Sequence, residues 1–204
     1  MRRKHPAVLL ILLLLLSACG SAGDENRVAA FRDALEQSAV TCEAEVTAVW
    51  EDAQESFTLS CTETEDGARI AVLAPELLSG VTAEVSGEDA ALSFDGLVVP
   101  TPLRPGGVSA LAALPTVITA LRTGHLDLVW REGDALAAQL ILRDDLAVRV
   151  FFTAEDVPAY AELILNGETA ARCVITQWNS SAKEDLNESH DSNLGGDQSQ
   201  DPGA

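Results

Sequence analysis

Leu16-Ser17-Ala18-Cys19 is the stretch of this sequence whose residue types and order could undergo a defined reaction. It follows a basic start, Arg2 to Lys4, and an unbroken apolar run from Val8 to Leu16. A positive region, an apolar region and small residues before a cut are the order of a secretory signal peptide. The two small residues let the active-site groove of a peptidase bind the backbone closely, and the residue that follows them is a cysteine, which carries a thiol.

The stretch resembles the lipobox of bacterial lipoproteins. That resemblance implies a diacylglyceryl thioether on Cys19, cleavage after Ala18, and acylation of the new amino terminus with a fatty acid such as palmitate. Two or more acyl chains anchor a protein stably, whereas one chain gives marginal binding. The alternatives are an ordinary cleaved signal with a cysteine nearby by chance, and a transmembrane helix. The leucine-rich run is far shorter than the roughly 20 residues that a bilayer requires.

The expected location is therefore the extracytoplasmic face of a bacterial cell membrane, with the protein held by lipid. Removal of residues 1–18 takes away three basic residues, so the formal net charge changes from -19 to -22. A strongly acidic chain repels phosphates, which excludes nucleic acid as a partner and argues against a face that binds anionic headgroups. The remaining partners are the membrane, through the anchor, and a lipid or a protein.

Composition divides the chain into four parts. Residues 1–18 are the signal peptide, and residues 19–23 are the lipidated cysteine and a short tether. Residues 24–178 form a single domain, large enough to bury one core. Residues 179–204 are almost entirely polar and are predicted to be a disordered acidic tail.

The period of the apolar residues predicts a helix at 24–38, with Asp24 as its N-cap, and a second helical region at 109–123. In that region we expect a short turn and then a helix with Pro115 in its first turn and Gly124 as its C-terminal stop. Alternating segments and turn residues predict strands elsewhere. These strands are 40–50, 56–62, 68–74, 81–86, 90–94, 97–100, 125–131, 134–142, 146–153, 158–165 and 169–178. Short connections imply antiparallel pairing. The prediction is an α+β fold: a curved antiparallel sheet of roughly nine to eleven strands, by turn spacing, with two helical regions against it.

Few residues have the spacing that catalysis requires, so we expect no enzyme, no cofactor and no metal site. The sequence contains no HExxH or CxxC motif. Ser109 lies in an imperfect nucleophile elbow, but a serine before a helix is more often its cap. Paired carboxylates such as Asp144-Asp145 lie at turns, where solvated loops are expected. Cys42 and Cys61 would face each other across a hairpin, either as a disulfide or, the favoured interpretation, as buried free thiols.

The order of one helix and then a long meander interrupted once by helices resembles the LolA-like lipoprotein-carrier superfamily. Val72-Leu73-Ala74-Pro75-Glu76 followed by Leu78-Ser79-Gly80 is similar to small lipoproteins of spore-forming bacteria, the spore germination group. The resemblance implies an open half-barrel around helices that leaves a hydrophobic cradle. The soluble carriers lack a lipobox, so an anchored binding module fits better than a shuttle.

Alternation puts several apolar residues on sides of strands that could line such a cradle: Trp50, Phe57, Leu59, Leu128, Trp130, Val148, Val150 and Phe152. The alternative is that they are core, because a sheet face normally meets its own helices. Phe31, Ile118 and Leu121 are available to fill the space.

Two functions remain open. One is a non-catalytic module that binds a lipid, an acylated chain or a partner protein. The other is an envelope or spore-associated scaffold with a filled core that acts through protein contacts alone. For a protein partner we expect an edge strand at 169–178 to dock it through Trp178. The alternative for Trp178 is that it merely caps the end of the sheet.

Overall fold

A computed structural model describes residues 21–50, 53–87, 89–102 and 109–182 of the protein. Cys19, the signal peptide and the chain after Ala182 lie outside the described residues, so lipidation and the disordered tail remain predictions. The first half contains α2 (Ser21–Glu36), β1 (Ser38–Trp50), β2 (Ala53–Thr64), β3 (Gly67–Ala74), the 3₁₀ turn η1 (Glu76–Leu78), β4 (Thr82–Ser86), β5 (Asp89–Phe94) and β6 (Leu97–Pro102). The second half contains α3 (Ala110–Thr123), β7 (His125–Glu132), β8 (Ala135–Arg143), β9 (Leu146–Phe152), β10 (Pro158–Leu165) and β11 (Glu168–Ala182).

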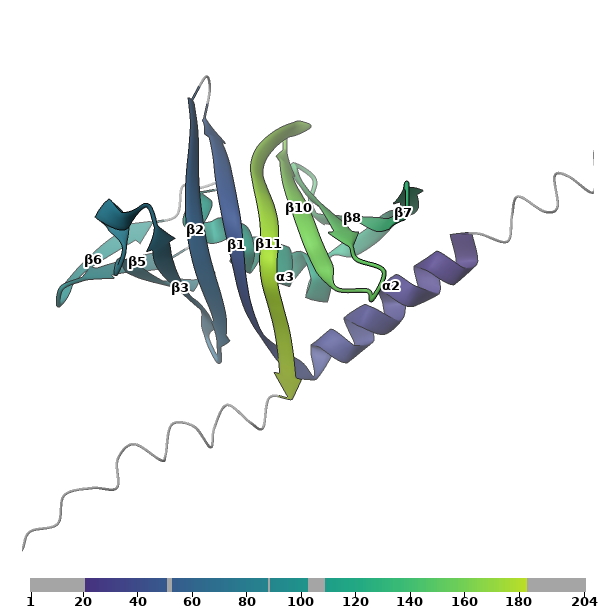
Figure 1. The fold of residues 1–204 in the computed structure, drawn as a ribbon, viewed down its shortest axis with the longest axis horizontal. Helices are drawn as coiled ribbons and strands as arrows, with labels where there is room; N and C mark the ends of the chain where they lie inside the picture. Colours follow the sequence, from purple (N-terminus) through teal and green to yellow (C-terminus); the bar gives the residue numbers. More distant parts are fainter. Residues whose placement is uncertain (1–20, 51–52, 88, 103–108, 183–204) are drawn as a thin grey trace, which may run out of the picture.

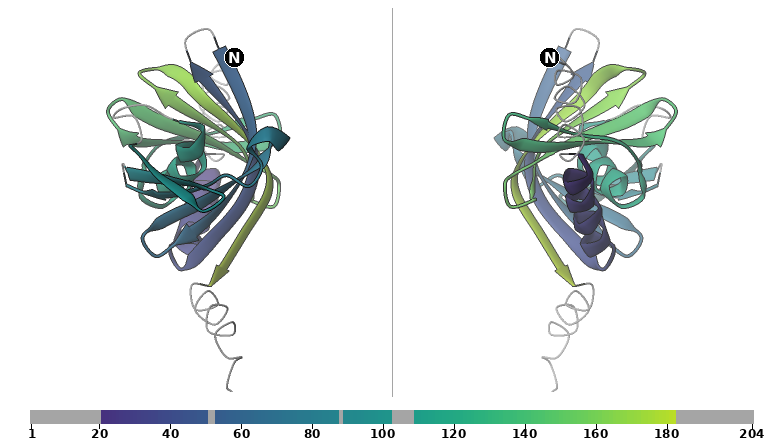
Figure 2. Two further views of the ribbon diagram at one scale, coloured as in Figure 1. Left: turned by 90° about the vertical axis from the view of Figure 1, so that its left-hand side faces the viewer. Right: turned by 90° about the vertical axis from the view of Figure 1, so that its right-hand side faces the viewer.

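The described strands form one antiparallel sheet in the order β6-β5-β4-β3-β2-β1-β11-β10-β9-β8-β7. The sheet is unclosed and curves around both helices (Figure 1 and Figure 2). The predicted α+β class, the antiparallel pairing and the curved sheet with two helical regions are confirmed. The turns at Asp95-Gly96 and Asn166-Gly167 have positive φ at both residues, between 48° and 84°, as such two-residue hairpin turns require.

The prediction that the last strand lies at an edge is wrong. β11 pairs with β1 on one side and with β10 on the other, so it lies near the middle of the sheet. The first meander runs from β1 outward to β6, and the second runs from β7 inward to β11. Pairing β1 with β11 joins the two meanders and leaves β6 and β7 as the edges of the described sheet. β11 also extends past Trp178 to Ala182, and residues 179–182 pair with residues 38–41.

The core lies between the concave face and α3, which packs against strands β1–β4 and β8–β11. Leu114, Val117, Ile118 and Leu121 of α3 are at most 3% exposed. Opposite them, alternate residues of the sheet such as Val46 are fully buried. Full burial of each such side chain stabilises the fold by roughly 1.5–3 kcal/mol.

α3 starts earlier than the sequence predicts. Ser109 is its N-cap and accepts a hydrogen bond from the Ala112 N–H at 3.2 Å, so the helix includes the turn before Pro115. Proline inside a helix costs about 3 kcal/mol or more. The buried side chains on both sides of Pro115, including Leu114 and Val117, offset that cost. The predicted stop at Gly124 is confirmed.

α2 also starts earlier than predicted, at Ser21 and not at Asp24, because its first turn is hydrogen-bonded to the sheet. Residues 21–23, assigned to a tether, are helical, and Asp24 is in the first turn rather than at the N-cap. The Asp24 carboxylate accepts two hydrogen bonds from Arg131 of β7, at 2.9 and 2.6 Å. One turn further on, Arg27 donates to the Asp156 carboxylate in the loop between β9 and β10, at 3.1 and 2.5 Å.

Arg32 joins the two helices to each other and Arg122 joins α3 to the sheet, and both also bind backbone carbonyls. Arg32 of α2 donates to the carbonyls of Leu121 and Gly124, at 2.8 and 2.6 Å, and so caps the C-terminus of α3. Arg122 of α3 donates to both oxygens of Glu63 on β2, at 3.0 and 2.6 Å.

Arg122 also donates to the carbonyls of Leu35 and Ser38, and the Glu63 carboxylate accepts the Val40 N–H at 2.7 Å. One half-buried ion pair therefore connects α2, β1, β2 and α3.

Candidate functional site

The predicted cradle residues divide between the two faces of the sheet. Leu59 and Phe152 are buried on the concave face, and Phe57 is half-buried and packs against the same core. The backbone of Trp50 pairs with Ala53 at the end of β1, and its side chain lies outside the described residues.

Leu128 and Trp130 lie on the outer face, so their assignment to a concave cradle is wrong. The register shifts between Leu126 and Leu128: Leu126 pairs with Leu140, whereas Leu128 pairs with Gln139. This bulge at Asp127 turns every later side chain of β7 to the other face. Val129 instead packs against the core, and Leu128 is 53% exposed.

The space that a cradle would leave open is occupied by α3 and part of α2. Ile118 and Leu121 are buried, and Phe31 is half-buried against the core. The Phe31 ring centroid is 5.3 Å from that of Phe152 and 6.4 Å from that of Trp178. Of the two arrangements considered from the sequence, this packing favours the filled core.

Trp178 lies on the concave face because of a second bulge. Ile175 pairs with Ala44 and Gln177 with Glu43, so Thr176 is an extra residue, and Trp178 then pairs with the buried Cys42. With Phe31, Trp178 lines a groove of about 590 Å³ between α2, the β9–β10 loop and the end of β11. Its Nε1–H is buried and has no hydrogen-bond partner among the described residues.

An exposed apolar surface lies at the β6 end of the sheet, and we name it the distal patch. It consists of Phe94, Leu97 and Val99, which are 52%, 67% and 46% exposed and share one face of the hairpin, together with Val98, which is 60% exposed on the other face. These residues belong to the β5–β6 hairpin, and β6 is an edge strand. The patch was not predicted from the sequence. Leu97-Val98-Val99 is three apolar residues in a row, so both faces of β6 carry apolar side chains, and that run was the available signal.

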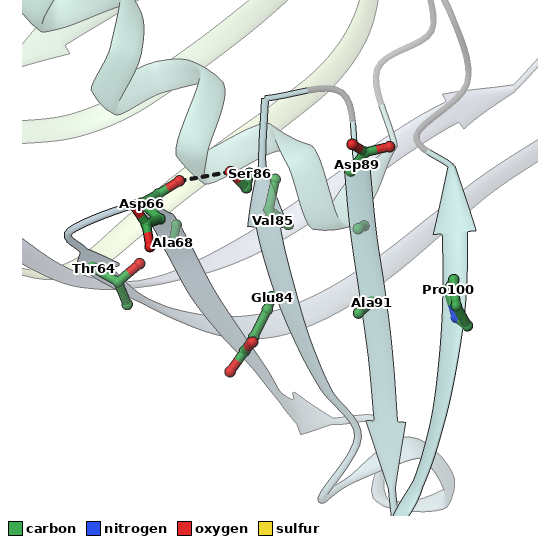
Figure 3. A pocket seen from close by; sticks show the side chains of 10 residues that line it. Thr64, Asp66, Ala68, Glu84, Val85, Ser86, Asp89, Ala91 and Pro100 are labelled. Atoms are coloured by element: carbon green, nitrogen blue, oxygen red, sulfur yellow. Dashed lines mark hydrogen bonds between the residues drawn. The ribbon is translucent and has the colours of Figure 1, made fainter.

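Figure 3 shows an acidic groove of about 560 Å³ on the same strands, and Pro100 in its lining is the residue after Val99 of the distal patch. Asp66, Glu84 and Asp89 are the charged side chains among its described lining, and Glu84 also pairs with Arg69 at 2.9 Å. The remaining lining is small, apolar or hydroxylic: Thr64, Ala68, Val85, Ser86, Ala90, Ala91 and Pro100. An apolar surface beside carboxylates is chemically suited to a segment that combines apolar and basic side chains.

The potential nucleophiles have structural roles. Ser109 caps α3, which confirms that interpretation. Cys42 and Cys61 face each other in the predicted register and are free, buried thiols, as the favoured interpretation expected. A hydrogen bond with Cys42, together with burial, raises the pKa of Cys61, and burial raises the pKa of Cys173 to about 12. Such thiols are not thiolates at neutral pH.

Among the described residues, no group of three or more histidines, cysteines or carboxylates is placed to hold a metal ion. No helix within the described ranges has both the length and the apolar character needed to cross a bilayer.

No protein-family model matches the sequence, and no curated protein matches it significantly. An uncharacterized conserved protein from Thermus thermophilus is similar in structure, with 12% identity over 79% of this chain and 87% of its own, at a TM-score of 0.42. A LolA superfamily protein from Nitrosomonas europaea has 11% identity over 72% and 92%, at a TM-score of 0.38. A chain in the complex of the CwlD amidase with the GerS lipoprotein from Clostridioides difficile has 16% identity over 79% and 93%, at 0.39.

The structures similar to this chain thus include a LolA superfamily protein and a complex that contains the GerS lipoprotein.

Proposed function

We propose that this protein is a lipid-anchored, non-catalytic binding protein that holds a partner protein on the extracytoplasmic side of a membrane. The observation that carries the proposal is the distal patch, an exposed apolar surface on an edge strand of a sheet whose concave face is otherwise covered. Monomeric proteins rarely leave large apolar patches exposed unless something docks there.

The position of the distal patch suits an anchored protein. β6 and β7 are the opposite edges of the sheet, and the start of α2 is bonded to β7. Figure 1 shows the start of α2 and β6 at opposite ends of the long axis. An anchor at Cys19, two residues before α2, would therefore leave the distal patch directed away from the membrane and accessible to another protein.

Side chains rather than backbone strand addition are the expected mode of docking. Pro100 and Pro102 on β6 have no N–H, and proline on an edge strand limits pairing with a further strand. The acidic groove adds charge selectivity, because carboxylates attract a basic partner and speed its association at low salt. The expected partner presents apolar side chains flanked by lysine or arginine.

The test is capture of partner proteins from solubilised membranes by the wild-type chain and by Leu97→Asp. The matched control is Val174→Asp, which places the same charge on an exposed apolar position of the central strand β11. We expect Leu97→Asp to lose proteins that Val174→Asp retains, and we expect their capture to fall as salt rises from about 0.05 M to about 0.5 M. Equal capture by the two variants would count against the proposal.

A second candidate is binding of a lipid or an acylated chain in the groove beside Phe31 and Trp178. Its volume, about 590 Å³, is within the range of roughly 300–1,000 Å³ that is typical of small-molecule sites. Native mass spectrometry of the secreted Cys19→Ala chain separates this candidate from the first, because no anchor lipid is then present. A stoichiometric lipid adduct would favour the groove, and its absence would favour capture of a protein.

A further inference from the structure

The outer face of β7–β10 carries three aromatic side chains and one leucine, which we name the proximal patch: Leu128, Trp130, Phe151 and Tyr160. The Trp130 and Phe151 ring centroids are 5.9 Å apart, and those of Phe151 and Tyr160 are 5.5 Å apart. Trp130 pairs with Ala137, Ala137 pairs with Phe151, and Phe151 pairs with Tyr160. Paired residues lie on the same side of a sheet, so these side chains share one face. The chain has only nine aromatic residues, and three of them lie here, on the face opposite the helices.

The proximal patch is amphipathic. Its rings border a groove of about 660 Å³ that is also lined by Glu132, Arg149 and Glu162. The Tyr160 hydroxyl donates to Glu162 at 2.9 Å, and Arg149 and Arg172 lie 4.0 and 3.8 Å from the same carboxylate. Apolar rings that border charged side chains, with the Tyr160 hydroxyl bonded to one of them, are suited to a boundary between water and an apolar phase.

The patch lies next to the expected anchor point. Arg131, which binds the Asp24 carboxylate, is the residue after Trp130. That bond fixes the first turn of α2 against β7, and Figure 1 shows the two elements side by side at this end of the molecule. Cys19 precedes Ser21 by two residues, a span of at most ~7 Å. The acyl chains of Cys19 would therefore enter the membrane close to the β7 edge of the sheet.

We infer that the proximal patch lies in the interfacial layer of the bilayer that holds the acyl chains of Cys19, an inference that rests on the proposed lipid anchor. Trp and Tyr are enriched at membrane interfaces because an apolar ring and a polar atom are both satisfied there. A zwitterionic lipid surface is the one that suits this contact, because a mature charge of -22 opposes anionic headgroups. Contact at both the anchor and the patch sets the orientation of the domain and holds the distal patch away from the membrane.

The experiment uses the full acylated chain in phosphatidylcholine vesicles, with and without bromine on the lipid tails. Brominated lipid quenches tryptophan only at close range. Trp130→Phe removes the proposed reporter and keeps an aromatic ring, and Trp178→Phe is the matched control. We expect quenching of the wild type and of Trp178→Phe, and loss of the quenched component in Trp130→Phe. We also expect weaker quenching when about a third of the lipid is anionic phosphatidylglycerol.

Flotation of the protein with the vesicles, measured on the same samples, reports the anchor separately. Flotation without quenching, or the same quenching in Trp130→Phe as in the wild type, overturns the proximal contact while the anchor stands. Failure to float overturns both the anchor and the contact. Quenching at Trp130 that appears only after a protein partner is added assigns the patch to that partner and also overturns the inference.

Discussion

Replacing Arg122 with methionine tests whether the half-buried ion pair with Glu63 holds the helices on the sheet. The two side chains are 16% and 19% exposed, and the guanidinium serves two carbonyls besides the carboxylate. Methionine keeps the apolar stem but leaves the Glu63 carboxylate with one remaining donor in the described structure, the Val40 N–H. Breaking a buried pair by removing one partner costs about 3–5 kcal/mol, and the residual exposure places this change near the lower bound, ~3 kcal/mol.

The matched control is Arg69→Met. Arg69 pairs with Glu84 at 2.9 Å, a similar distance, but those side chains are 62% and 69% exposed. An exposed pair contributes about 0.2–1 kcal/mol.

The assay is urea unfolding and thermal unfolding of the Cys19→Ala chain with each substitution. We expect Arg122→Met to lower the melting temperature by about 6–12 °C, taking about 2–4 °C per kcal/mol for a domain of this size. Arg69→Met should lower it by no more than about 4 °C. Equal losses in the two variants would refute the argument that burial decides the strength of these pairs.

Three further predictions follow from the titratable groups. Hydrogen bonds from Arg131 lower the pKa of Asp24, so this carboxyl stabilises the folded state above the usual carboxyl pKa, and that stability is lost as pH falls through the lowered value. Asp24→Asn should therefore flatten the acid side of a stability-versus-pH curve. An unchanged curve would contradict the Arg131 contact. Burial and, to a smaller extent, the hydrogen bond to Glu162 raise the pKa of Tyr160 to about 12. Because the sequence has one tyrosine, ultraviolet titration reports this residue alone. The folded chain should show no phenolate near the usual tyrosine pKa, and Glu162→Gln should ionise at a lower pH than the wild type. The stability linked to Tyr160 is complete below the usual tyrosine pKa and is lost as pH rises through about 12. Cys42, Cys61 and Cys173 should resist a thiol reagent in the native Cys19→Ala chain and react after unfolding, and reaction of any of them without unfolding would contradict their burial.

Local patterns predicted the elements well, because their causes are local. Alternation located the strands, and the turns at Asp95-Gly96 and Asn166-Gly167 followed from residues that tolerate positive φ. The Cys42–Cys61 register followed from a short connection. The starts of the helices were less predictable. The start of α2 is held by a hydrogen bond to β7, which is distant in sequence. In α3, burial of the neighbouring side chains offsets the cost of Pro115 inside the helix.

The site could not be predicted for three physical reasons. Bulges at Asp127 and Thr176 reverse the alternation, so Leu128, Trp130 and Trp178 lie on faces that a period of two does not assign them. The first strand pairs with the last, a non-local contact that no local pattern reveals. The edges of the described sheet are therefore β6 and β7 and not the predicted β11. The run Leu97-Val98-Val99 indicates apolar side chains on β6, but their exposure depends on which elements cover that edge of the sheet, and the run alone does not determine this.

Docking of a protein at the distal patch of the anchored chain can be tested in intact cells. The most direct measurement is photo-crosslinking in intact cells from a photoreactive side chain at position 97, with the same side chain at position 174 as the control. We expect a discrete protein adduct from position 97 that is absent from position 174 and is reduced by neutralising Glu84 and Asp89 of the acidic groove. Identical adducts from both positions, or adducts to lipid alone from position 97, would contradict it.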